Sequence, residues 1–312
     1  MQRHLQRLLP WLLLAAAVAL PWIAGALDQG YYVGFVRRLM IYALAATALN
    51  FVMGHAGLVS LGHAAFFGAG AYTVAIAMAH GVTSAWIAWP LAAGAAALLA
   101  LAIGALSLRT RGVYFIMITL AFAQMVYYVA VGLKQYGGED GISLPQRSAL
   151  GFGLDAADEL TLYYVVLALL AATLLLLNRM MDARFGRVLL GIRENEARMQ
   201  ALGYATYRYQ LLAFVIAGAA AGLAGALFAN HNTFVSPAAL HWTQSATFVV
   251  MVLVGGIGYR YGGVLGAFAL LLLEEVLAAY TDHWHLPLGL VLLAVVFLAP
   301  RGLAGTLARR PS

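Results

Sequence analysis

Residues 178–210 read NRMMDARFGRVLLGIRENEARMQALGYATYRYQ and form the one long polar stretch between apolar segments that carries a cluster of arginines. Its six arginines outnumber its three acidic residues, so six minus three leaves a net charge of +3 on one loop. Membrane proteins keep positively charged loops on the cytoplasmic side. The loop is therefore predicted to be cytoplasmic, and it sets the orientation of every span that precedes or follows it.

Within this loop, residues 188–202 interleave Arg and Glu with Leu, Ile, Ala and Met, a composition typical of a short amphipathic helix. Gly203 follows at the point where such a helix would stop. A cytoplasmic helix docked between two spans suggests a partner below the membrane.

The composition indicates a membrane protein. Hydrophobic residues make up 63% of the 312 residues, 10% are charged, and the mean hydropathy is +0.86. No water-soluble globular domain tolerates that balance, so the chain is predicted to be an all-α, polytopic membrane protein. The net charge of +6 comes from seventeen arginines and one lysine that mostly separate apolar runs, which makes nucleic acid a poor explanation. Cysteine is absent, which excludes disulfide, thiol and cysteine-ligated metal chemistry.

A membrane span needs about 20 apolar residues, and ten segments come close to this length. The predicted spans are residues 8–27, 36–53, 57–79, 85–106, 112–133, 161–177, 211–230, 244–258, 262–281 and 286–300. The third is rich in glycine and the eighth is short, so either is a candidate for a re-entrant or broken segment. The prediction is a single transmembrane domain over residues 1–312 with about ten helices.

Counting outward from the basic loop places both termini on the cytoplasmic side, together with the arginine-bearing turns at residues 109–111 and 260. The opposite loop, residues 134–160, carries five acidic residues against two basic ones and is predicted to be periplasmic. Only Arg37 and Arg38 fall on the wrong side. The first segment is long for a cleaved signal and contains two prolines, so it is interpreted as a retained helix.

Several enzymatic functions are excluded by inspection. The single lysine is followed by Gln135, so the chain has no GxxxxGK[ST] phosphate loop and its energy must come from elsewhere. HExxH, GxSxG and Cys–His patterns are missing, and the eight histidines show no metal-ligand spacing beyond the weak pair at 283 and 285. No catalytic residue, metal site or cofactor is predicted, and the chain is expected not to be an enzyme.

The most distinctive apolar stretch is GHAGLVSLGHAAFFGAGAY, residues 54–72, in which five glycines recur among small residues. One interpretation is tight helix packing through small residues. The other is an interrupted helix that lines a substrate path, where freed backbone groups and polar side chains are solvated. Under the second interpretation, the lining residues are Asn50, His55, Ser60, His63 and Tyr72, joined by Thr119 and Gln124 of the fifth span. For the last two, hydrogen bonding between helices is an equal alternative.

A second glycine-rich stretch, GGIGYRYGGVLG at residues 255–266, lies in the other half of the chain at a comparable place. The pair hints at a repeated half-structure of the kind that many transporters use, although the two stretches share little sequence. Glu274 and Glu275 of the ninth span project about 100° apart around a helix, so at most one of them is expected to face a pathway.

Seven short motifs follow one another along most of the chain. They are GLVSLGHAAFFGAGAY (57–72), RGVYFIMITLAFAQM (111–125), GGEDGI (137–142), GRVLLGIRENEARMQALGY (186–204), AFVIAGAAAGLAGALFA (213–229), VVMVLVGGIG (249–258) and PRGLAG (300–305). In order and spacing they resemble the LivM-type permease subunits of branched-chain amino acid ABC importers. The resemblance implies a heterodimer with a second related permease, two cytoplasmic ATPase subunits, a periplasmic substrate-binding protein and a place in the bacterial inner membrane.

The resemblance also gives the arginine-rich loop a role. Residues 193–203 resemble the coupling helix that seats in a groove of the ATPase, where ABC importers more widely carry an EAAxxxG pattern. Here Glu196, Ala197 and Arg198 stand in that place, and Gly203 follows Glu196 by seven residues instead of six. The candidate coupling residues are Arg193, Glu194, Glu196, Arg198 and Gly203. The alternative is a solvated helix that merely obeys the orientation rule.

The function implied is the import of branched-chain, aliphatic amino acids by alternating access, driven by ATP hydrolysis on partner chains. Similar permeases serve urea and short amides, and nothing in a glycine-rich lining decides between these substrates. A stand-alone channel or ion-driven carrier is an alternative that predicts transport without partners. An integral-membrane enzyme is another, and it predicts a convergent cluster of ionisable residues that the sequence does not show.

Overall fold

Helices dominate the computed structural model, which describes residues 17–22, 30–151, 158–281, 283–299 and 301–307. Among these residues, six helices are long and apolar enough to cross a membrane, and three shorter apolar helices accompany them. The helices and strands are, in chain order, α2 (Gly30–Phe51), η1 (Val52–Ala56), α3 (His63–Ala79), α4 (Ala85–Ser107), α5 (Val113–Gly132), η2 (Lys134–Tyr136), β1 (Ile142–Ser143), α6 (Glu159–Asp182), α7 (Arg184–Glu194), α8 (Glu196–Ala201), α9 (Thr206–Asn232), β2 (Phe234–Val235), η3 (Pro237–Leu240), α10 (Trp242–Gly255), α11 (Gly262–Tyr280), α12 (His285–Leu298) and α13 (Gly302–Leu307). The predicted all-α, polytopic membrane fold is confirmed.

Each predicted span after the first corresponds to one of these helices. Those at α3, α10 and α12 are shorter than a full crossing needs, and the other six meet the length. The first predicted span, residues 8–27, lies mostly outside the described residues. A total of ten spans and two cytoplasmic termini therefore stay predictions.

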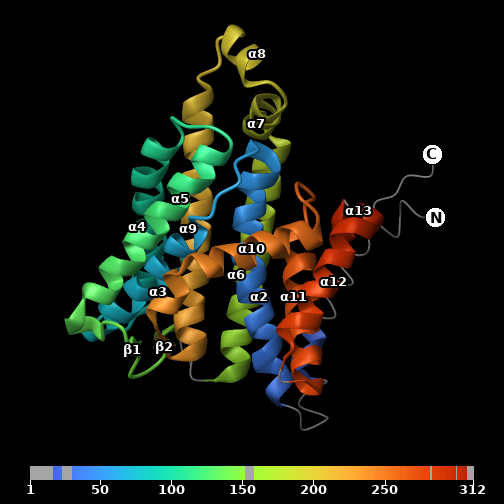
Figure 1. The fold of residues 1–312 in the computed structure, drawn as a ribbon. Helices are drawn as coiled ribbons and strands as arrows, with labels where there is room; N and C mark the ends of the chain where they lie inside the picture. The colour runs from blue at the N-terminus through green and yellow to red at the C-terminus, as the bar shows by residue number, and fades with distance from the viewer. Residues whose placement is uncertain (1–16, 23–29, 152–157, 282, 300, 308–312) are drawn as a thin grey trace.

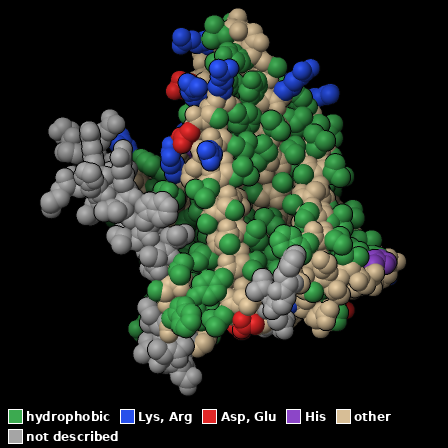
Figure 2. All heavy atoms as spheres, turned by 180° about the vertical axis from the view of Figure 1, so that it is seen from behind, with side chains coloured by type: hydrophobic (Ala, Val, Ile, Leu, Met, Phe, Trp, Pro, Cys, Tyr) green, Lys and Arg blue, Asp and Glu red, His purple; other side chains and the backbone are tan. Residues whose placement is uncertain are grey.

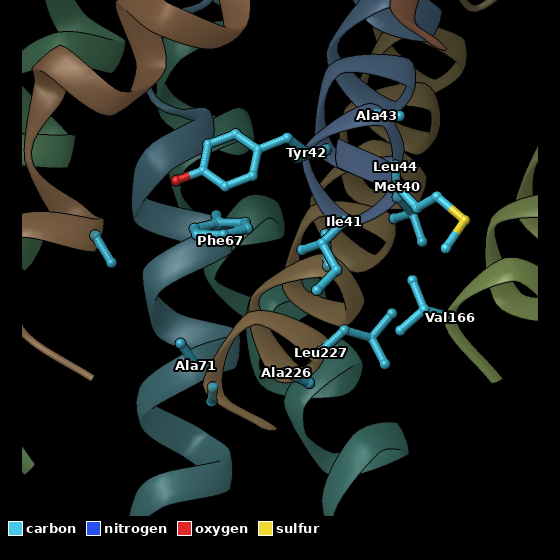
Figure 3. Packing of buried hydrophobic residues seen from close by; sticks show 14 of the residues in the cluster. Met40, Ile41, Tyr42, Ala43, Leu44, Phe67, Ala71, Val166, Ala226 and Leu227 are labelled. Atoms are coloured by element: carbon cyan, nitrogen blue, oxygen red, sulfur yellow. The ribbon is translucent and has the colours of Figure 1, made fainter. Parts of the chain in front are cut away.

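Helix α2 lies at the centre of the bundle, where it packs against α6, α9, α10 and α11 (Figure 1). It is the most buried of the six long helices, with 94% of its most apolar stretch inside the molecule. Figure 3 shows Ile41 of α2 facing Leu227 of α9, while Tyr42 packs beside Phe67 of α3. Because lipid is as apolar as these side chains, close packing rather than escape from water holds such helices together.

The glycines of α3 and α9 bring these two helices into backbone contact. A Cβ atom at Gly70 would lie 2.0 Å from the carbonyl oxygen of Gly222, and a Cβ atom at Gly225 would lie 1.7 Å from that of Phe67. No side chain fits at either position. Tight packing through small residues therefore describes the part of the 54–72 stretch that lies in α3.

The other interpretation of this stretch, an interrupted helix, holds for its first part. Helix α2 passes into the π-helical turn η1, an irregular segment follows at residues 57–62, and α3 begins only at His63. Gly57 has a φ of +72°, a conformation that residues with side chains rarely adopt. The third predicted span is thus broken, and π turns of this kind are common at functional sites.

Helix α10 is the second short element. It has 14 residues and lies across the bundle rather than along it (Figure 1), which explains why the eighth predicted span is short. The turn at residues 256–261 then leads into α11. A Cβ atom at Gly255 would lie 1.8 Å from the carbonyl oxygen of Gly262, so α10 and α11 also meet through glycine backbone.

The two polar loops lie at opposite ends of the molecule. Helices α7 and α8 form the tip at one end, and the small antiparallel sheet of β1 and β2 lies at the other, the sheet end of the molecule (Figure 1). The sheet pairs Ile142 with Val235 and Ser143 with Phe234, so the loop at 134–160 meets the chain segment after α9. Figure 2 shows arginine side chains gathered at the α7–α8 tip, next to a surface dominated by hydrophobic side chains. The predicted orientation, with the 178–210 loop and the 134–160 loop on opposite sides of the membrane, requires that these loops lie at opposite ends of the molecule.

Candidate functional site

The basic loop folds into two helices rather than one. Helix α7 ends at Glu194, and the φ of −157° and ψ of 97° at Asn195 are those of an extended chain. Asn195 Oδ1 accepts a 2.9 Å hydrogen bond from the backbone N–H of Arg198 and so caps α8. The single helix predicted for residues 188–202 is therefore wrong, because this asparagine ends one helix and begins the next. The predicted stop at Gly203 is confirmed, where φ is +85°.

Arg193 is the residue by which the basic loop contacts the broken helix. Its Nη1 donates a hydrogen bond to the carbonyl oxygen of Gly54 in η1. Its aliphatic stem lies on Gly57, where a Cβ atom would be 3.1 Å from Arg193 Cγ. Carbonyl groups at the end of a helix lack partners within it, and a guanidinium supplies a charge-assisted one. Helix α7 is thus held directly against the break.

Glu196 turns toward the body of the molecule. Its Oε1 accepts hydrogen bonds of 3.2 Å from Gln200 Nε2 and from Thr206 Oγ1. The same oxygen lies 3.3 Å from Nη2 of Arg111, and the Glu196 side chain is 21% exposed. Glu196 therefore ties α8 to the start of α9 and to the turn before α5.

The remaining coupling candidates lie on the outer surface of the tip. Glu194, Arg198 and Gly203 are exposed. Leu202 and Tyr204 lie beside them, with 65% and 41% of their surface exposed. Large apolar side chains that a charged rim surrounds are typical of a surface that a protein partner covers.

Asn50 holds the two glycine-rich stretches together. Its Nδ2 donates a 2.8 Å hydrogen bond to the carbonyl oxygen of Tyr259, and its Oδ1 accepts a 2.9 Å bond from the N–H of Gly258. Gly54 touches the same turn, where its Cβ atom would lie 2.5 Å from the Cα atom of Gly258. Because both ends of the Asn50 amide are used and the residue is 2% exposed, it fixes the turn after α10.

His55 lies at the α7 end of α2, with Nδ1 3.3 Å from the carbonyl oxygen of Phe51. It borders a narrow crevice together with Asn178 of α6 and Arg260 of the turn after α10. Arg260 also forms an ion pair with Asp182. The crevice therefore lies where η1, the end of α6 and the 256–261 turn converge.

Hydroxyl side chains from three segments satisfy the backbone at the break. Ser60 Oγ accepts a 3.1 Å hydrogen bond from the N–H of residue 62. Thr119 Oγ1 of α5 accepts a 3.3 Å bond from residue 61, and Ser245 Oγ of α10 accepts a 2.8 Å bond from residue 64. Since the first N–H groups of a helix have no partner within it, these bonds anchor the start of α3 to α5 and α10.

His63 is fully buried, and neither of its ring nitrogens has a hydrogen-bond partner among the described residues. Its ring packs edge-on against Phe66 and Phe214, with ring centroids 5.4 Å and 5.8 Å away. Leaving a buried polar group unpaired costs about 1–3 kcal/mol. His63 thus packs between aromatic rings that offer its ring nitrogens no hydrogen-bond partner.

Tyr72 and Gln124 lie apart from the break. Tyr72 is 5% exposed on α3, and its hydroxyl has no hydrogen-bond partner within the described part of the chain. Gln124 is half-buried on α5. The seven pathway candidates therefore lie at the end of α2, at the break, and along α3 and α5, and their role in lining a path stays a prediction.

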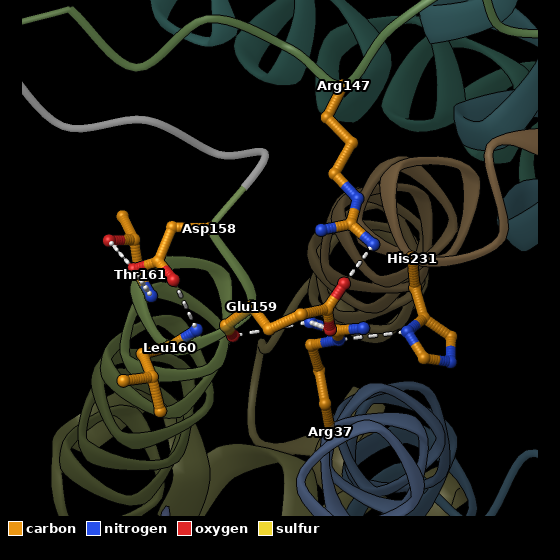
Figure 4. A network of polar contacts seen from close by, with 7 residues as sticks. All are labelled: Arg37, Arg147, Asp158, Glu159, Leu160, Thr161 and His231. Atoms are coloured by element: carbon orange, nitrogen blue, oxygen red, sulfur yellow. Dashed lines mark hydrogen bonds and ion pairs between the residues drawn. The ribbon is translucent and has the colours of Figure 1, made fainter. Parts of the chain in front are cut away.

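Sequence reasoning missed a polar cluster at the sheet end of α2. Arg37 Nη1 lies 2.5 Å from Glu159 Oε2, and Arg147 Nη2 lies 2.5 Å from Glu159 Oε1 (Figure 4). Arg37 Nε also donates a 2.9 Å hydrogen bond to His231 Nδ1. The sequence did contain a sign of this cluster, because Arg37 and Arg38 are predicted to lie on the same side of the membrane as the acidic loop at 134–160. Their pairing explains how the Arg37 side chain, only 3% exposed, is tolerated there.

Arg38 and the two adjacent glutamates of α11 form a second group beside this cluster. Arg38 Nη2 lies 4.0 Å from Glu274 Oε1, and the Tyr31 hydroxyl donates a 2.5 Å hydrogen bond to Glu275 Oε1. Both glutamates therefore contact α2, although adjacent residues point in different directions around α11. Within the described residues, no three His, Cys, Asp or Glu side chains gather in a way that would hold a metal ion.

A bundle of long apolar helices with a basic helical tip defines a multi-pass membrane protein. A family model described as the permease component of branched-chain amino acid transport systems matches residues 31–299. The chain belongs to this family of ABC-transporter permeases.

Individual relatives agree with the family model. The chain is 32% identical to the high-affinity branched-chain amino acid transport system permease protein LivM of Escherichia coli, over 96% of this chain and 75% of the relative. It is 25% identical to the probable LivM permease of Methanocaldococcus jannaschii, over 67% of this chain and 66% of the relative. The autoinducer 2 import system permease protein LsrC of Klebsiella pneumoniae is 36% identical over 44% of this chain and 42% of the relative. No solved structure matches the chain.

Proposed function

We propose that this chain is the transmembrane permease subunit of an ATP-binding-cassette importer that moves branched-chain, aliphatic amino acids across the bacterial inner membrane. Membership of the permease family and the similarity to the LivM proteins support the substrate class. The importer is completed by a second related permease, two cytoplasmic ATPase subunits and a periplasmic substrate-binding protein. The single observation that carries the mechanism is the contact between Arg193 and the carbonyl oxygen of Gly54.

Transport proceeds by alternating access. ATP binding and hydrolysis on the partner chains displace α7 and α8. Because Arg193 joins α7 to Gly54, and Gly54 touches the backbone of Gly258, one displacement reaches both glycine-rich stretches at once. Irregular segments and π turns absorb changes in backbone dihedral angles, so motion of the tip opens one end of the path as it closes the other.

The coupling residues divide between two tasks. Glu194, Arg198 and Gly203 lie on the exposed surface of the tip and contact the ATPase, with Leu202 as an apolar anchor. Arg193 and Glu196 contact the rest of the bundle, through Gly54 and Arg111, and pass the displacement to it. At the opposite end, the loops at 134–160 and 230–243 contact the binding protein.

The substrate path passes the break. Ser60 and Thr119 hold the break closed through their hydrogen bonds to its backbone. His63 has no polar partner in this conformation, so opening of the break gives it water or substrate to bind and offsets the cost of the motion. The inner end of the same path is bordered by His55.

An Arg193→Ala variant tests the mechanism in the assembled importer reconstituted into liposomes. ATPase activity is expected to persist, while ATP-driven leucine uptake falls about tenfold or more, because one charge-assisted hydrogen bond contributes about 1.5–3 kcal/mol. The matched control is Arg187→Ala, which removes the same charge from an exposed position of α7. Equal uptake by both variants would remove Arg193 from the coupling path.

Reconstitution of the lone chain separates this proposal from a stand-alone carrier. A carrier predicts leucine uptake without partners or nucleotide, whereas a permease subunit predicts none. Competition of labelled leucine uptake by unlabelled urea, acetamide and isoleucine then tests the substrate class. Isoleucine alone is expected to compete.

A further inference from the structure

A cavity of about 530 Å³ opens between α2 and α9 at the sheet end of the molecule. Its size lies within the range of about 300–1,000 Å³ typical of small-molecule sites. Gly34 borders it, and a Cβ atom at Gly34 would meet no atom within 4 Å. The glycine therefore leaves real space, in contrast to the glycines that bring α3 and α9 together.

The cavity has a charged side. Arg38 lines it and lies 4.0 Å from Glu274, with side-chain exposures of 40% and 28%. At that distance the pair is too loose for a hydrogen bond, so both groups keep free positions for other partners. His231 also lines the cavity. Its Nδ1 accepts from Arg37, which leaves Nε2 as the protonated donor of a neutral ring.

The opposite side is apolar and aromatic. Phe35, Tyr42 and Phe228 border the cavity, and the rings of Tyr42 and Phe228 meet edge to face with centroids 6.1 Å apart. The guanidinium of Arg38 lies 5.7 Å from the centre of the Tyr42 ring. This contact orients the charge toward the cavity without neutralising it.

Charge balance limits the class of ligand. Among the residues that border the cavity, Arg38 carries the charge, and the carboxylate of Glu274 lies 4.0 Å from its guanidinium, so the opposite charges at this wall cancel. A simple anion or a simple cation would therefore gain little. A molecule with separated opposite charges and an apolar side chain matches both the charges and the aromatic wall.

We propose that this cavity is a subsite for a zwitterionic aliphatic amino acid, in which Arg38 binds the carboxylate, Glu274 binds the ammonium group, and Phe35, Tyr42 and Phe228 contact the side chain. The subsite rests on the proposed function. It assigns the permease itself a share of the substrate recognition that otherwise lies with a binding protein.

Filling the cavity is the first test, with labelled leucine uptake measured in the complete importer in liposomes. Gly34→Leu is expected to lower uptake about tenfold or more, because its side chain occupies the space. Gly34→Ala is the matched control and is expected to keep wild-type uptake, since its Cβ atom meets nothing. Subunit assembly and basal ATPase activity show whether each variant is intact.

Removing the carboxylate partner is the second test and does not depend on the first. Wild type is expected to prefer leucine over leucinamide as a competitor, and Arg38→Gln is expected to raise the KM for leucine about tenfold and abolish that preference. A purely structural role would weaken both competitors equally. If the Gly34→Leu importer is intact and transports normally, or if Arg38→Gln keeps the preference for leucine, the subsite is wrong. Failure of the wild-type importer to take up leucine overturns the proposed function instead.

Discussion

The two ends of α2 are built in opposite ways. At the α7 end the backbone is tightly packed, since a Cβ atom at Gly54 would lie 2.5 Å from the backbone of Gly258 and both ends of the Asn50 amide are bonded. At the sheet end, Gly34 and Arg38 border a cavity, and a Cβ atom at Gly34 would meet no atom within 4 Å. One helix thus combines a tightly packed end with an end that borders a cavity.

The contrast predicts its largest effect at the two glycines. Gly54→Ala is expected to destabilise the folded chain by about 3 kcal/mol, because the backbone of the 256–261 turn must shift. Gly34→Ala is expected to be neutral or to stabilise α2 by about 0.5–1 kcal/mol through helix propensity. Thermal unfolding of the purified complex measures both. Similar melting temperatures for the two variants would contradict the difference between the two ends.

A smaller effect is expected from the ion pairs at the sheet end. Glu159→Gln leaves the buried guanidinium of Arg37 without its carboxylate partner. Removing one partner of a buried pair costs about 3–5 kcal/mol, but Glu159 is 53% exposed, which reduces the expected loss to about 2 kcal/mol. Glu139→Gln, at an exposed position of the same outer loop, is the control and should unfold at the wild-type temperature. A stable Glu159→Gln chain would show that the cluster is a surface feature.

The smallest effect concerns Asp158, which caps α6 beside this cluster. Hydrogen bonds from the hydroxyl and backbone N–H of Thr161 lower the pKa of the Asp158 carboxyl below its usual value. A lowered pKa in the folded state stabilises the fold above the unfolded pKa of about 3.9, and this contribution is lost as pH falls through the folded pKa.

Asp158→Asn keeps a capping side chain but does not titrate. The variant is expected to match wild type within about 1 kcal/mol at neutral pH, because both residues cap well. On acidification from pH 7 to pH 3, wild type is expected to lose more stability than the variant. Parallel unfolding curves across this range would exclude a titrating cap at Asp158.

Much of the fold and part of the candidate site were predictable. The interruption before α3 was one of two interpretations of the glycines between residues 54 and 70, and it holds at residues 57–62, whereas Gly68 and Gly70 lie within the continuous helix α3, where they allow close packing. The stop at Gly203 was also predictable, since glycine commonly follows a helix end. The break at Asn195 was missed, because a composition that suits one amphipathic helix suits two shorter ones equally well.

Pairing of polar residues could not be predicted. Arg193, a candidate for coupling to the ATPase, donates a hydrogen bond to Gly54, which lies 139 positions earlier in the chain. Asn50, a candidate for lining a path, borders the crevice beside η1 and also holds a turn more than 200 positions later. Arg37 and Arg38 depart from the orientation rule, and only the structure shows that Glu159 and Glu274 lie beside them as acidic partners.

The sequence by itself determined that the chain is a helical membrane protein, where most spans lie, and to which permease family it belongs. These properties follow from hydrophobicity summed over neighbouring residues and from local motifs, which need no knowledge of what lies across the bundle. Only the tertiary structure decided which way Arg193 points, which arginine meets which glutamate, and where α2 is tight or open. The physical reason is that hydrogen bonds and ion pairs act over a few ångströms, and helix packing sets those distances between residues far apart in the chain.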